Sequence, residues 1–142
     1  MIVTVYSPPR RQAMNMQDLI SLARRPLPTY FFADLNAQHT LFGYGRANNM
    51  GNILAALIQR NILTYLGPDF KTRITAVHAT TPDIALGNRY ANLNIALQQG
   101  PMSSSDHLPM YIRLATKPIT IRGRKVMKIK KIKLGIISEV SH

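Results

Sequence analysis

Apolar residues follow two different periodicities along the first half of the chain. Residues 1–6 and 28–33 are short apolar runs rich in β-branched or aromatic side chains, and they predict two buried strands. In residues 14–25 and 47–62 the apolar positions recur at helical spacing, which predicts two amphipathic helices. Pro26 is expected to end the first helix, and Asn48 or Asn49 to cap the second.

From Leu63 onward the pattern changes to short apolar runs separated by Gly and Pro, which predicts a series of short strands. The expected strands are 63–66, 72–78, 83–86, 91–98 and 108–114. This order of strands and helices predicts an α+β domain in which helices pack on the faces of a sheet. We place this domain at residues 1–116.

The composition changes after Pro118. Eight Lys or Arg residues lie between Lys117 and Lys133, where they alternate with aliphatic residues and no acid occurs. We treat residues 117–142 as a basic tail or linker. The sequence is compatible with an edge strand, an amphipathic segment or a linker, so its conformation stays open.

Composition narrows the class of protein. The 142 residues suffice for one domain or a piece of one, and 46% hydrophobic residues exclude general disorder. The absence of cysteine excludes disulfides and thiolate sites. No run approaches the roughly 20 apolar residues of a membrane span, and the start lacks the pattern of a signal peptide. We therefore expect an intracellular protein without membrane contact.

The charge balance points to a polyanionic partner. Eighteen Lys and Arg residues oppose six acids, which gives a net charge of +12. Such an excess most often indicates nucleic acid binding, although it says nothing about fold.

Asp34 and Asn36 lie two residues apart where the second predicted strand ends. Alternation along a strand would place both side chains on one side of its carboxyl end, where layered sheets often bind ligands. Taken alone, the spacing is more typical of a loop that starts with a helix cap or an Asx-turn. The functional interpretation therefore depends on the rest of the chain.

Three further stretches place polar residues at strand ends or in the loops that follow them. In one of them, a serine-rich turn puts Asp106 and His107 directly before the last predicted strand. Each stretch alone is typical of a turn or of a structural histidine, and only their combination favours a site. The four stretches are residues 5–9, 33–39, 81–86 and 103–110.

Taken in this order, the stretches resemble the motifs of the exonuclease–endonuclease–phosphatase superfamily. They are most similar to the endonuclease domains of non-LTR (LINE-type) retrotransposon polyproteins. The resemblance runs from residue 2 to 115 and implies the C-terminal portion of a DNase I-like fold, a four-layer α/β-sandwich built on two sheets. The counterparts of the family motifs are Tyr6-Ser7-Pro8-Pro9, Asp34-Leu35-Asn36-Ala37, Thr72, Pro82-Asp83-Ile84 and Ser105-Asp106-His107-Leu108-Pro109.

The resemblance implies a catalytic role for five residues. Asp34 would orient or deprotonate the attacking water, and Asn36 would donate hydrogen bonds to the phosphate or hold the nucleophile. His107 would lie against a phosphate oxygen, while Asp83 would bond the far ring nitrogen and fix the tautomer. Tyr6 would contact the phosphate or stabilise the departing oxygen.

The resemblance also implies a metal and substrate contacts. Asp106 would be a ligand of Mg²⁺ or Mn²⁺ or a partner of such a ligand. Thr72 and Ser105 would bind DNA phosphate or position their neighbours. The family's principal metal ligands, an Asn and a Glu, precede the Tyr-x-Pro-Pro strand at which this chain begins, and Glu139 has the wrong context. We therefore expect the N-terminal portion of the sandwich to be missing and the metal to be weakly held.

Two functions from different classes follow. The first is a metal-dependent DNA endonuclease that nicks target DNA in the nucleus to prime reverse transcription, impaired here by the truncation. Its partners would be DNA and a reverse transcriptase region of a longer polyprotein, with no haem or nucleotide cofactor. The second is a non-catalytic, basic nucleic-acid-binding remnant, whose affinity would fall steeply with salt.

Overall fold

The computed structural model describes residues 1–8 and 15–115. The basic tail and the expected domain boundary before it lie outside these residues. The elements in chain order are β1 (Ile2–Tyr6), α1 (Met16–Ala23), β2 (Tyr30–Asp34), the 3-10 helix η1 (Thr40–Phe42), α2 (Asn49–Gln59), β3 (Leu63–Gly67), β4 (Arg73–Ile74), β5 (Ala79–Thr80), β6 (Asp83–Asn88), β7 (Ile95–Gln99) and β8 (Met110–Leu114).

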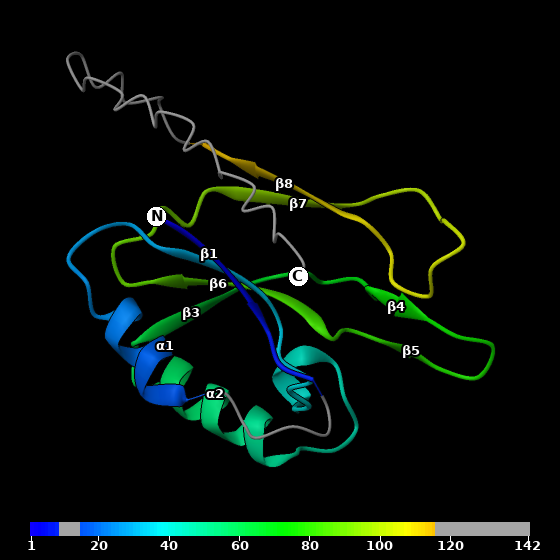
Figure 1. Cartoon of the computed structure of the whole chain (residues 1–142), viewed down its shortest axis with the longest axis horizontal. Helices are drawn as coiled ribbons and strands as arrows, with labels where there is room; N and C mark the ends of the chain where they lie inside the picture. The colour runs from blue at the N-terminus through cyan, green and yellow to red at the C-terminus, as the bar shows by residue number, and fades with distance from the viewer. Residues whose placement is uncertain (9–14, 116–142) are drawn as a thin grey trace, which may run out of the picture.

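A four-stranded sheet in the order β1-β2-β6-β3 forms the centre of the fold. β1 runs parallel to β2, whereas β6 is antiparallel to both of its neighbours, β2 and β3. Two hairpins, β4–β5 and β7–β8, complete the strands of the described part. Figure 1 shows α1 and α2 together on one side of the sheet and the β7–β8 hairpin on the other. This mixed architecture of several sheets and few helices is compatible with the predicted α+β class.

The core lies between the helices and one face of the sheet. Alternate residues of the two central strands, such as Phe31 in β2 and Leu86 in β6, point to this face and are fully buried. Leu54 of α2 packs against them from the helix layer. Burying each such side chain contributes about 1.5–3 kcal/mol. None of the helices in the described ranges has the length and apolar character that crossing a membrane requires.

The first predicted strand forms, but the prediction that it is buried was wrong. Val3 and Val5 pack against the core, whereas Ile2 and Tyr6 on the other face are 60% and 68% exposed. The reason is position, since β1 is an edge strand whose outer face lacks a covering layer among the described residues. The second predicted strand is buried as expected, with Tyr30 and Ala33 at most 5% exposed.

The strand predicted over 72–78 is instead a hairpin. After β4 the chain turns at Thr75, whose backbone N–H donates to the His78 carbonyl oxygen at 2.8 Å. The Thr75 hydroxyl also accepts from the His78 N–H at 3.0 Å and so replaces strand pairing locally. The alternation of apolar residues in this stretch therefore marks two short strands and a turn, with Val77 exposed at the tip.

Candidate active site

Two central strands bring a pair of carboxylates together. Because β2 and β6 are antiparallel, the last residue of β2, Asp34, is the register partner of the first residue of β6, Asp83. Both side chains lie on the face of the sheet away from the helices, since the residues next to them, Ala33 and Ile84, point into the core. Neither carboxylate is fully buried.

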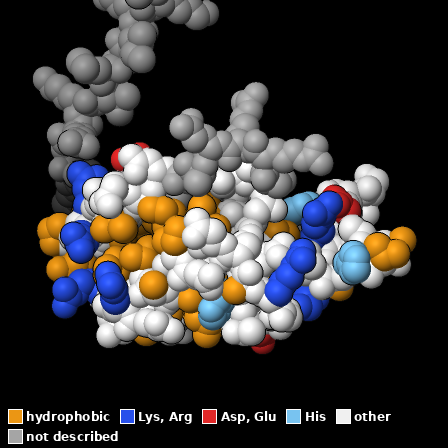
Figure 2. Space-filling view, turned by 90° about the horizontal axis from the view of Figure 1, so that it is seen from below, with side chains coloured by type: hydrophobic (Ala, Val, Ile, Leu, Met, Phe, Trp, Pro, Cys, Tyr) orange, Lys and Arg blue, Asp and Glu red, His pale blue; other side chains and the backbone are white. Residues whose placement is uncertain are grey.

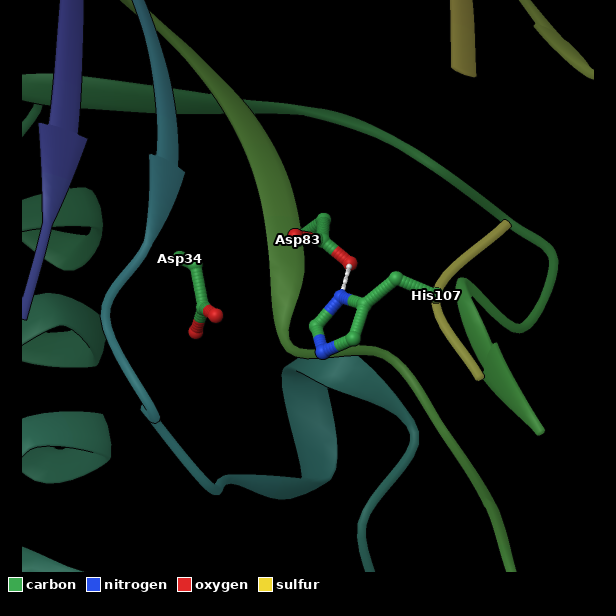
Figure 3. Close-up of side chains that lie close together, drawn as sticks. All are labelled: Asp34, Asp83 and His107. Carbon is green, nitrogen blue, oxygen red and sulfur yellow. Dashed lines mark hydrogen bonds and ion pairs between the residues drawn. The ribbon is translucent and has the colours of Figure 1, made fainter. Parts of the chain in front are cut away.

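His107 reaches this pair from the loop that precedes β8. The loop is held by the β4 region, where the Leu108 N–H donates to the Thr72 carbonyl oxygen at 2.7 Å. The imidazole Nδ1 then lies 2.9 Å from Oδ2 of Asp83. Figure 3 shows the three side chains, Asp34, Asp83 and His107, around a common space. One ligand atom from each lies within 4.8 Å of the others, so the three groups can act on one small ligand.

Burial raises the pKa of the Asp34 carboxyl above its usual range. The backbone N–H of Asn36 opposes this shift, the Asp83 carboxylate adds to it, and the nearby His107 and Arg73 side chains oppose it. A carboxyl with a raised pKa is a better proton acceptor near neutral pH than an exposed one, and such groups are frequent in functional sites.

Asn36 has a structural task in addition to its expected chemical one. Its backbone is left-handed, with φ of 48°, and its N–H donates to Oδ1 of Asp34 at 3.3 Å, which is the Asx-turn considered for this loop. Its amide nitrogen donates to the Ser7 carbonyl oxygen at 2.8 Å and so links the ends of β1 and β2. The turn and the carboxylate cluster therefore use the same aspartate.

Tyr6, Thr72 and Ser105 lie around the cluster in different ways. Tyr6 is the register partner of Asp34 on the neighbouring strand, and its side chain is exposed. Thr72 is completely buried, and its hydroxyl accepts a hydrogen bond from the Asp83 N–H at 3.2 Å. The Ser105 hydroxyl accepts from the His107 N–H at 3.1 Å. Of the two roles expected for Thr72 and Ser105, these contacts suit the positioning of neighbours.

Asp106 is not part of the cluster of Asp34, Asp83 and His107. Its carboxylate forms an ion pair with Arg73, with 2.7 Å between Oδ2 and Nε. Hydrogen bonding and the charge of Arg73 lower the pKa of the Asp106 carboxyl. The structure thus brings together Asp34, Asp83 and His107 and leaves the expected metal ligand in a separate, exposed pair.

A model of the endonuclease-reverse transcriptase family matches residues 1–111, a range that contains the whole cluster. The chain belongs to the endonuclease-reverse transcriptase family. The relationship to the exonuclease–endonuclease–phosphatase superfamily and to retrotransposon endonucleases, predicted from the motifs, is therefore confirmed. No curated protein matches the chain.

In this member of the endonuclease-reverse transcriptase family, the start of α2 holds the loop that follows Asp34. The Asn48 amide donates to the Asn36 carbonyl oxygen at 2.7 Å, while its Oδ1 accepts from the N–H groups of Gln38 and Gly51. Gly51 packs so closely that an added Cβ would lie 1.8 Å from the Gln38 carbonyl oxygen. The sequence predicts an N-cap at Asn48 or Asn49, but nothing in it indicates that the cap also clamps the site loop.

A cavity of about 800 Å³ adjoins the cluster on the side of the β4–β5 hairpin. Sequence reasoning missed its residues, among them Tyr44, which follows η1 and faces Thr80. Burial raises the pKa of the Tyr44 phenol, so that it stays a neutral hydrogen-bond donor at neutral pH. Arg46 and Arg73 give the cavity a positive lining. The cavity therefore offers a positively lined space beside the cluster.

Replacing Asp34 by asparagine is expected to stabilise the metal-free protein at pH 7. Because the folded-state pKa of this acid is raised, its contribution to stability is full at low pH and is lost as pH rises through that pKa. The asparagine side chain would keep the acceptor for the Asn36 N–H without the charge. In EDTA the Tm should rise by a few degrees at pH 7 and by less at pH 3. An unchanged or lower Tm at pH 7 would contradict the assigned burial of this carboxylate.

Proposed function

We propose that this chain carries the catalytic cluster of a metal-dependent phosphodiesterase that nicks target DNA and leaves a 3′-hydroxyl to prime reverse transcription. One observation carries the proposal. Within residues matched by an endonuclease family, Asp34, Asp83 and His107 converge from three separate segments to within 4.8 Å. Few structural roles require an acid, an acid and an imidazole to meet at one partly exposed point.

Each of the three residues has a distinct task in this proposal. Asp34 accepts a proton from the attacking water, a task that the upward shift of its pKa supports. Asp83 accepts a hydrogen bond from the Nδ1–H of His107, and when the ring carries a proton on both nitrogens its Nε2–H can donate to a phosphate oxygen. Thr72 in turn holds the backbone of Asp83. The contacts therefore form a chain from the buried Thr72 through Asp83 and His107 to the substrate.

The donor set fits a divalent cation. Two carboxylates that converge suit Mg²⁺ or Mn²⁺, because both cations bind carboxylate oxygens well. Asp34 and Asp83 would hold the ion, since both ring nitrogens of His107 are engaged by Asp83 and the phosphate, and the ion would supply positive charge against a phosphoryl oxygen. Asp106, expected as a ligand from the motif, would act through its pairing with Arg73 instead.

The same proposal includes the partners and the complete architecture. We propose DNA as substrate, a reverse transcriptase region in a longer polyprotein, and action in the nucleus. We also propose that the four-stranded sheet is one of the two sheets of a DNase I-like sandwich. The exposed side chains of Ile2 and Tyr6 on its outer face support a further layer there.

The alternative is a non-catalytic nucleic-acid-binding protein. The net charge of +12 favours it, because phosphate contacts alone give affinity without any cluster. It predicts binding that is insensitive to changes in Asp34.

Nicking of supercoiled plasmid by the purified chain tests the proposal. Cutting is expected with Mg²⁺ or Mn²⁺ and is expected to vanish in EDTA, because the substrate and the carboxylates repel each other without the ion. Asp34→Asn serves as the matched variant, since it keeps size and hydrogen-bond acceptor. Folding of both proteins is checked by circular dichroism.

The outcomes separate the two candidate functions. Metal-dependent nicking that Asp34→Asn removes supports the nuclease. A folded protein that binds DNA at low salt in a gel-shift assay but does not nick it with either metal would contradict the nuclease proposal. It would leave the non-catalytic binding function.

A further inference from the structure

Three arginines surround a small cavity at the end of the molecule opposite the candidate active site. Arg24 follows α1, Arg60 follows α2 and Arg89 follows β6, and all three line a cavity of about 260 Å³. Figure 1 places the ends of both helices at one side, and Figure 2 shows a group of Lys and Arg side chains there. The six residues of β6 separate this cavity from Asp83 by about 17 Å.

A buried asparagine holds the backbones that carry two of these arginines. Asn88 is completely buried, and its amide nitrogen lies 3.2 Å from the Ala23 carbonyl oxygen and 2.9 Å from that of Leu27. Its Oδ1 accepts from the N–H of Thr29 and that of Tyr90. The segments on either side of Arg24 and Arg89 are therefore fixed relative to each other before any ligand binds.

The third arginine is placed by the turn between α2 and β3. Asn61 adopts a left-handed backbone with φ of 55°, and the Ile62 N–H donates to the Leu57 carbonyl oxygen at 3.0 Å. Leu63 then pairs with Asn88 in the sheet. The backbone that carries Arg60 is thus linked through the sheet to the backbone segments that carry Arg24 and Arg89.

The positive charge of this cavity is not neutralised within the described residues. None of the ion pairs found there involves Arg24, Arg60 or Arg89. The guanidinium of Arg89 lies 5.7 Å from the ring centre of Tyr90, which orients the group without cancelling its charge. The partial negative charges at the C-termini of α1 and α2 offset roughly one positive charge in total. The three arginines therefore leave a net charge of about +2 at the cavity.

We propose that Arg24, Arg60 and Arg89 form a second anion site, which takes phosphate groups of a nucleic acid backbone apart from the candidate active site. Planar guanidinium groups on a fixed frame suit phosphate oxygens, because little side-chain freedom is lost for each hydrogen bond formed. The site deepens the proposed function by adding a contact away from the point of cutting. It does not need cutting to occur, so it can be tested in the absence of metal.

Salt-dependent binding of duplex DNA to the full chain in EDTA tests the site. The variant is Arg60→Gln/Arg89→Gln, and the matched control is Arg25→Gln/Arg113→Gln, which removes the same charge from exposed arginines outside the cavity. A duplex of about 20 base pairs, roughly 70 Å long, reaches both ends of the molecule. Fluorescence anisotropy gives the dissociation constant at a series of salt concentrations.

The slope of log affinity against log salt is expected to fall by about 1–2 in the cavity variant and by less than about 0.5 in the control. Equal changes in the two variants would overturn the site, because they would mean that only total charge matters. Inorganic phosphate is expected to displace the duplex from the wild type better than chloride does at equal ionic strength, and equal displacement by the two anions would count against a phosphate site. Failure of plasmid nicking, in contrast, bears on the candidate active site alone.

Discussion

His107→Ala is expected to lower the rate of metal-dependent plasmid nicking by about 10²–10⁴-fold, the usual contribution of a positioned acid or base. The substitution removes the imidazole and leaves the Asp83 carboxylate without its 2.9 Å partner. The two carboxylates then lose the neighbouring group that is proposed to contact the phosphate. The initial rate of conversion from supercoiled to open-circular plasmid measures the effect.

Two variants make this result specific. Asp83→Asn keeps an acceptor for Nδ1 but loses the charge, so its rate should fall between that of the wild type and that of His107→Ala. His39→Ala is the matched control, because His39 caps η1 and accepts from the Leu41 N–H at 3.1 Å, outside the cluster. A His107→Ala protein that is folded and nicks at the wild-type rate would remove His107 from the chemistry.

Gly51→Ala is expected to destabilise the fold by about 3 kcal/mol or more. The new methyl group would lie 1.8 Å from the Gln38 carbonyl oxygen and 2.5 Å from the carbonyl carbon, and backbone atoms cannot move aside as a flexible side chain can. Either α2 shifts or the loop after Asp34 does. Since a domain of this size is stable by about 5–15 kcal/mol, the loss is a large fraction of the total.

Urea unfolding measures this change, and Gly45→Ala is its control. Gly45 has no atom within 4 Å of an added Cβ, so that substitution should alter the free energy of unfolding by no more than about 0.5 kcal/mol. A shift of the midpoint in Gly51→Ala without a change in slope identifies lost stability. Equal midpoints for the two variants would mean that α2 does not pack on the loop as described.

The spacing of apolar residues predicted the helices and the central strands, because the residues that recur at this spacing share one face and become buried together. The helix expected over 47–62 forms as Asn49–Gln59, since Leu54 and Leu57 lie on one face and meet the sheet. Exposure of β1 could not be predicted, because an apolar run does not reveal whether another layer covers it. The hairpin at Thr75 was missed for a related reason, since one hydroxyl decides between strand and turn.

The sequence predicted those parts of the candidate site that lie within short motifs. Asp34, Asp83 and His107 meet because each lies at or beside a strand end, a placement that sequence pattern can indicate. The pairing of Asp106 could not be predicted, because its partner Arg73 lies 33 residues away in the sequence. The hydrogen bonds between Asn48 and the loop after Asp34 could not be predicted for the same reason, because they join separate segments of the chain.

The attachment of His107 has a consequence for inactivation. Its loop is held by backbone hydrogen bonds to the β4 region, from the Leu108 N–H to the Thr72 carbonyl oxygen and from the Ile74 N–H to the Asp106 carbonyl oxygen, whereas its bond to the four-stranded sheet is the side-chain contact between His107 and Asp83. Mild heat or low denaturant can release this loop by local opening while the core stays folded. Loss of the ring N–H resonance of His107 should then precede loss of the far-ultraviolet signal, and activity in the proposed nicking reaction should be lost before the protein unfolds.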